Sequence, residues 1–127
     1  MAWRLGKGSE VRLRGVHEDL ALVVRRALEI SELDFSVTEG MRTLERQREL
    51  VASGKSKTLN SRHLTGHAVD LAAIVDGKVS WEWKYYELLA NAMKQAATEL
   101  GVAIEWGGDW ETFKDGPHFQ LSRKEYQ

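Results

Sequence analysis

The stretch Ser61-Arg-His-Leu-Thr-Gly-His-Ala-Val-Asp70 places reactive side chains at a spacing that constrains the path of the chain. His63 and Asp70 are seven residues apart. On a helix that separation leaves two side chains on one face but about 10 Å apart, and on a strand it places them on opposite faces. For both to reach one metal ion the chain must fold back between them, and Gly66 is where it can. The stretch is therefore predicted to be a loop that leads into a strand.

A second short motif, Asp115-Gly-Pro-His118, lies near the other end of the chain. Its central Gly-Pro pair prevents a helix, so we expect a turn that aims both outer side chains at one point. His118 would join His63 and Asp70 as three ligands and leave the fourth tetrahedral position of zinc for water, as in catalytic zinc sites. Asp115 would remain as a free base that takes a proton from water and passes one to the leaving amine. These residues predict metal-assisted hydrolysis of a peptide bond.

Arg42 follows a predicted strand and is the candidate cation of this site. A positive charge beside the metal would stabilise the negative charge that develops on the carbonyl oxygen. A surface ion pair with Glu39 or Glu45 is the alternative, and such pairs contribute little to stability.

Four further side chains are candidates for substrate contact or for support of the metal ligands. Ser61 could instead cap a turn, and His67 could be a plain surface residue. Trp106 and Trp110 flank two glycines just before the predicted base, so they could wall a substrate cleft or pack in the core.

Apolar periodicity and turn signals over the rest of the chain predict an α+β domain, with helices packed on a small, mostly antiparallel sheet. A strong hairpin signal stands at Asp76-Gly77. His17, near the start of the first helix, is predicted to be structural. Helices are expected over residues 16–31, 44–53 and 83–100, and strands over 34–40, 68–75, 102–106 and 118–121. We expect one domain over residues 1–127.

Composition narrows the classes of function. The 127 residues include 18 basic and 19 acidic side chains and no cysteine, so a metal must be held by histidines and carboxylates. The balanced charge and a pI of about 6.4 disfavour nucleic-acid binding. No apolar run approaches the roughly 20 residues of a membrane span, and the start lacks the apolar segment of a signal peptide. The expected protein is a monomer made in the cytoplasm.

The two motifs resemble those of the zinc peptidases of cell-wall metabolism, which include the D-alanyl-D-alanine carboxypeptidases and dipeptidases. The similarity is closer to their phage-endolysin branch, the L-alanyl-D-glutamate endopeptidases, and runs from about Ser9 to Leu121. That branch carries stretches similar to residues 38–43, 61–71, 106–110 and 115–120 of this sequence. The base of the wider family is often Glu, so the aspartate at position 115 points to the endolysin branch.

The resemblance implies a fold like that of the D-alanyl-D-alanine peptidases and Hedgehog proteins, and one zinc ion on His63, Asp70 and His118 with Asp115 as base. It implies cleavage between the first two residues of the peptidoglycan stem peptide to lyse a bacterial host, with access to the wall through a phage holin or lysis. A D-alanyl-D-alanine or L,D-carboxypeptidase is the alternative. Two other classes of protein are further alternatives. A non-catalytic zinc module is expected to lack the base, whereas Asp115 is present. A metal-dependent nuclease is expected to carry a strip of basic residues, whereas the charge of this chain is balanced.

Overall fold

The computed structural model describes residues 3–112 and 114–126, and its strands form one antiparallel sheet. The strand order is β1-β2-β5-β4, with β3 paired to the far end of β2. This arrangement confirms the predicted α+β class. The strands are β1 (Asp34–Glu39), β2 (Ala68–Val75), β3 (Lys78–Ser80), β4 (Ile104–Trp106) and β5 (His118–Leu121).

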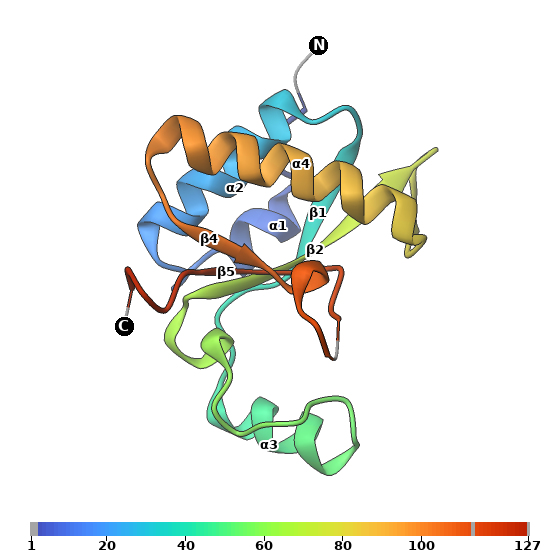
Figure 1. Ribbon diagram of the computed structural model, residues 1–127. Coiled ribbons are helices and arrows are strands. Elements are labelled where there is room, and N and C mark those ends of the chain that lie inside the picture. Colours follow the sequence, from blue (N-terminus) through green and yellow to red (C-terminus); the bar gives the residue numbers. More distant parts are fainter. Residues whose placement is uncertain (1–2, 113, 127) are drawn as a thin grey trace.

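Helices lie on both sides of this sheet, but unequally (Figure 1). Helices α1, α2 and α4 cover one face and enclose the main hydrophobic core with it. The segment that contains α3 projects from the opposite side as a separate lobe (Figure 1). The helices are α1 (Lys7–Arg12), α2 (Glu18–Ile30), α3 (Leu44–Ala52) and α4 (Trp83–Leu100), with short 3₁₀ turns η1 (Arg62–Thr65) and η2 (Gly107–Asp109).

The two central strands sort their side chains between the two faces. On β2, Val69 and Leu71 are fully buried in the core under the helices. Successive strand residues point to opposite faces, so Asp70 between them faces away from that core. On β5, Phe119 is likewise buried in the core while His118 shares the face of Asp70. The sheet thus presents its polar side chains toward the α3 lobe.

Several local predictions are confirmed. Residues 68–75, 83–100 and 118–121 have the predicted elements and bounds. Asp76 and Gly77 both have positive φ, at 52° and 78°, as a two-residue hairpin turn requires. The ends of two of the predicted helices follow known capping rules: Thr43 caps α3 by accepting a hydrogen bond from the amide of Arg46, and Gly101 ends α4 in the left-handed conformation.

Other local predictions need correction. The first predicted helix begins at Glu18 rather than Val16, because the ring of His17 caps its start by accepting from the Asp19 amide. The second predicted helix ends at Ala52 rather than at Ser53, and the strand predicted over 102–106 begins at Ile104. Helix α1 was not predicted, since six residues show too little periodicity.

None of the helices in the described part of the chain is both long enough and apolar enough to cross a membrane.

Candidate metal centre

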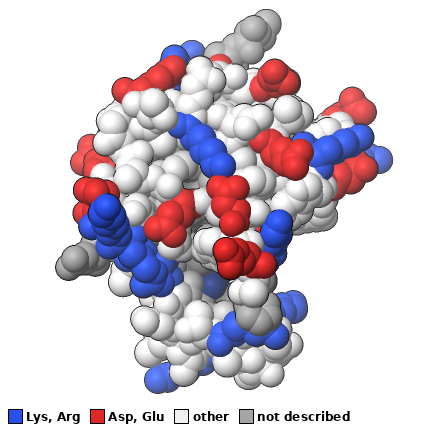
Figure 2. Space-filling model, viewed as in Figure 1, with Lys and Arg blue, Asp and Glu red and all other residues white. Residues whose placement is uncertain are grey.

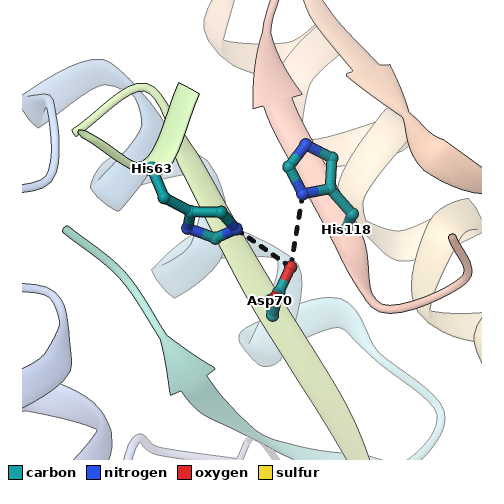
Figure 3. Close-up of side chains that lie close together, drawn as sticks. All are labelled: His63, Asp70 and His118. Atoms are coloured by element: carbon teal, nitrogen blue, oxygen red, sulfur yellow. Dashed lines mark hydrogen bonds and ion pairs between the residues drawn. The ribbon is translucent and has the colours of Figure 1, made fainter. Parts of the chain in front are cut away.

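The strand register brings three polar residues side by side at the centre of the sheet. Asp70 on β2 lies directly opposite His118 on β5 and opposite Glu39 on β1. His63 Nε2 and His118 Nδ1 approach the same carboxylate oxygen, Asp70 Oδ1, at 3.2 and 3.3 Å (Figure 3). One ligand atom from each of these three residues lies within 4.8 Å of the others. Two imidazoles and one carboxylate at such distances could hold a metal ion.

The loop before β2 aims His63 at this point by folding back, as the sequence predicted. The hydroxyl of Ser61 caps the turn η1 by accepting from the His63 amide at 3.2 Å. Gly66 then takes φ 74°, and a side chain there would collide with the carbonyl oxygen of Gly15. Only glycine satisfies both requirements, so Gly66 reverses the chain immediately before the strand.

Each histidine is held by a hydrogen bond from its other ring nitrogen. His63 Nδ1 lies 2.8 Å from the carbonyl oxygen of Gly40, which can only accept, so this nitrogen carries the proton. His118 Nε2 lies 2.8 Å from the side-chain oxygen of Gln120. In the neutral rings the remaining lone pairs face Asp70 together. Such outer hydrogen bonds typically fix the tautomer and orientation of metal-binding histidines.

Electrostatics favour a cation between these groups. Burial alone would raise the pKa of the Asp70 carboxyl, but hydrogen bonds from His118 and His63 outweigh it and hold that pKa well below its usual range. Burial likewise opposes the charged form of His118. The hydrogen bond to Asp70 and the negative charge of Asp70 nevertheless raise the pKa of the His118 ring. The carboxylate of Asp70 thus favours a proton on the neighbouring His118 ring. A metal ion bound by the same residues would compete with this proton.

Arg42 lies beside this cluster but is largely committed to other partners. It is only 9% exposed, and its Nε and Nη2 donate to the two carboxylate oxygens of Glu39, each at 2.7 Å. Its Nη1 donates to Gln47 at 2.6 Å, and its Nη2 lies 3.8 Å from Asp70 Oδ2. The pair with Glu39 that we considered does form, but it is buried rather than on the surface. Its role toward substrate remains a prediction.

A cleft of about 700 Å³ opens onto the cluster of His63, Asp70 and His118 between the sheet and the α3 lobe. Asp115 lines the cleft together with the three clustered residues. Its backbone forms the predicted turn, in which the His118 amide donates to the Asp115 carbonyl at 3.2 Å. Burial raises the pKa of the Asp115 carboxyl, and the charge of Asp70 raises it further. The arrangement places a further carboxylate in the same cleft as a cluster of residues that could hold a metal ion.

The other predicted side chains separate into two groups. Ser61 and Trp110 line the cleft, and the Trp110 ring lies 5.2 Å from that of His118. Trp106 packs in the core, where it stacks on Phe119 and donates to the Gly116 carbonyl. His67 contacts Thr65 and the ring of His17, and it is not among the residues that line the cleft.

Sequence analysis missed two residues that hold site side chains in place. Gln120 is hydrogen-bonded to the ring of His118, and Gln47 accepts from Arg42. Gln120 had a usable signal, because it stands two residues after His118 on a predicted strand and therefore shares its face. Gln47 had no such signal.

Comparisons with known proteins find a matching family model and similar proteins. The family model described as phage L-alanyl-D-glutamate peptidase matches residues 1–123. The L-alanyl-D-glutamate peptidase of Escherichia phage T5 is 35% identical over 130 residues, covering 99% of this chain and 94% of the relative. The peptidoglycan L-alanyl-D-glutamate endopeptidase CwlK of Bacillus subtilis is 31% identical over 102 residues, or 70% of this chain.

A solved structure is also similar over nearly the whole chain. The L-Ala D-Glu endopeptidase ChiX of Serratia marcescens is 56% identical with a TM-score of 0.92, covering 98% of this chain and 93% of that one. Two of the curated relatives are longer proteins, of which this chain spans 36% and 61%.

Proposed function

We propose that this chain, because it belongs to the phage L-alanyl-D-glutamate peptidase family, hydrolyses the L-alanyl-D-glutamate bond of the peptidoglycan stem peptide. The observation that carries the proposal is the cluster of His63, Asp70 and His118, which shares a cleft with the unligated carboxylate of Asp115. Relatives of this chain bear the name of that activity.

The metal we propose is one zinc ion per chain, held by the three clustered residues. Two neutral imidazole nitrogens and a carboxylate oxygen are ligands that zinc prefers, and three protein ligands leave a position open for catalysis. The hydrogen bonds to Gly40 and Gln120 support this fit, because they leave lone pairs facing the site. When bound, zinc would supply Lewis-acid polarisation of the scissile carbonyl and of the attacking water.

The residues around the zinc would then divide the proton transfers and charge stabilisation. Asp115 takes the proton of the attacking water and passes a proton to the amine of the departing glutamate, which is the usual task of a positioned carboxylate. Arg42 faces Asp70 and stabilises the negative charge that builds up on the carbonyl oxygen. Trp110 and Ser61 bound the space in which the stem peptide lies.

We also propose that the protein acts as a monomer in the cell wall, where its peptidoglycan substrate lies, after release through a phage holin or lysis.

Replacing Gln120 with leucine is expected to weaken zinc binding by about 10- to 100-fold, the usual cost of removing such support from a ligand. Without the amide oxygen the His118 ring can rotate or adopt the other tautomer. Competition with a zinc-binding dye measures the affinity. The variant Gln120→Glu keeps an acceptor and should retain near-normal affinity, whereas unchanged affinity in both variants would contradict the role of Gln120.

Digestion of purified peptidoglycan tests the reaction, the bond and the metal together. The zinc-loaded protein should release fragments with new glutamate amino termini, and a chelator should abolish them. Mass analysis of the fragments separates this result from free D-alanine, which would indicate a carboxypeptidase. Products that survive chelation would contradict the metal mechanism.

A further inference from the structure

Both acidic and basic side chains line the cleft. The acidic ones are Glu39, Asp70 and Asp115, of which Asp70 and Asp115 are half-buried. Of the six basic side chains that line the cleft, Arg42 and Arg62 are buried and the other four are exposed. We call these four the cationic rim: Lys55, Lys57, Lys114 and Arg123.

The cationic rim spans separate parts of the fold. Lys55 and Lys57 follow α3 in the projecting lobe, Lys114 lies in the loop before β5, and Arg123 follows β5. Figure 2 shows basic side chains and no acidic ones on the visible face of this lobe. The protein as a whole has a net charge of −1, so a cleft edge of this kind is a local feature.

Three of these four basic groups, those of Lys55, Lys114 and Arg123, form no ion pair with the rest of the described chain. The remaining carboxylate of the cleft, Glu39, is already engaged by Arg42, whose Nε and Nη2 donate to its two oxygens. An anionic ligand in the cleft would therefore meet three cations, Lys55, Lys114 and Arg123, that are in no ion pair with the described residues.

The proposed substrate carries its negative charge on one side of the scissile bond. A glutamate joined through its amine to alanine has two carboxyl groups, and only one can continue the stem peptide. The other stays a free carboxylate, on the side that leaves with the new amino terminus. The alanine side contributes no carboxylate, because its own is part of the scissile bond.

We propose that the cationic rim is a subsite for the free carboxylates of the stem peptide on the glutamate side of the scissile bond, and that it selects for this charge. The inference rests on the proposed function and adds which side of the substrate the rim binds. Exposed ion pairs contribute modestly, so each cation should change KM by roughly two- to fivefold, and three together by roughly ten- to a hundredfold.

The test compares two soluble stem peptides, one with the free glutamate carboxylate and one with that carboxylate converted to a carboxamide. The variant carries Lys55→Met, Lys114→Met and Arg123→Met. The matched control carries Lys7→Met, Arg14→Met and Lys78→Met, which remove three exposed cations outside the cleft. We expect the wild type and the control to prefer the free carboxylate through KM, and the rim variant to lose this preference with kcat unchanged.

Equal KM values for both peptides in the wild type, or a preference that survives in the rim variant, would overturn the inference. It would also be overturned if the rim variant digested whole peptidoglycan poorly but both peptides normally, because the cations would then bind another wall polymer. Calorimetric binding of both peptides to an Asp115→Asn variant tests the rim without turnover. A wild type that cleaves neither peptide would instead contradict the proposed function.

Discussion

The variant Asp115→Ala is expected to lower kcat for wall hydrolysis by about 10²- to 10⁴-fold, the usual contribution of a general base. Asp115 lies in the cleft but outside the group of three residues that could hold a metal. The variant should therefore still bind one zinc ion. Parallel measurements of zinc content and of fragment release from peptidoglycan would establish both points.

Stability provides the control for this variant, because loss of a structural residue would lower it. The pKa of the Asp115 carboxyl is raised by burial and by the charge of Asp70. When a carboxyl has a higher pKa in the folded than in the unfolded protein, the free energy of unfolding falls as the pH rises through the unfolded and then the folded pKa. Ionisation of Asp115 therefore disfavours folding at neutral pH. The metal-free Asp115→Asn variant should thus have a Tm at least as high as the wild type. Wild-type activity in Asp115→Ala would refute the assignment of the base.

The variant Asp70→Asn is expected to abolish both zinc binding at ordinary zinc concentrations and hydrolysis. Asp70 Oδ1 is the atom on which both histidines converge, and asparagine keeps the shape but loses the charge. The binding free energy of zinc at structural protein sites is roughly 10 to 16 kcal/mol. If each of three ligands contributes a third of it, loss of one ligand lowers the zinc affinity by about 10²- to 10⁴-fold. Competition with a zinc-binding dye and peptidoglycan digestion measure the two losses.

A matched control is Asp34→Asn, at the other end of the β1 and β2 pairing. It removes the same charge from the same sheet without touching the cluster, and it should keep full zinc affinity and activity. The Asp70 assignment would fail if Asp70→Asn bound zinc as tightly as this control.

Much of the fold followed from local rules that act within a few residues. The apolar residues of the 68–75 stretch predicted β2, and strand alternation then places Val69 and Leu71 on the face opposite to Asp70. The reversal at Gly66 followed from the need to bring His63 back to Asp70, and the structure shows the left-handed backbone there. Helix α1 escaped prediction because its six residues cannot show a period.

Contacts between distant segments could not be read in this way. Arg42 had two nearby carboxylates in the sequence, and packing of β1 against β2 selected Glu39 by placing it opposite Asp70. The same packing buried the pair, which local spacing could not indicate. Trp106 and Trp110 look equivalent in the sequence, yet one packs on Phe119 in the core and the other lines the cleft.

The amino-acid sequence therefore specified the α+β class, the main strands and helices, and the residue types suited to bind a metal, because backbone sterics and side-chain periodicity operate locally. Only the tertiary structure showed that His63, Asp70 and His118 converge to within 4.8 Å and that Gln120 holds His118. It alone gathered the cationic rim around one cleft. These features depend on strand register and on the packing of the α3 lobe, which join segments far apart in the chain.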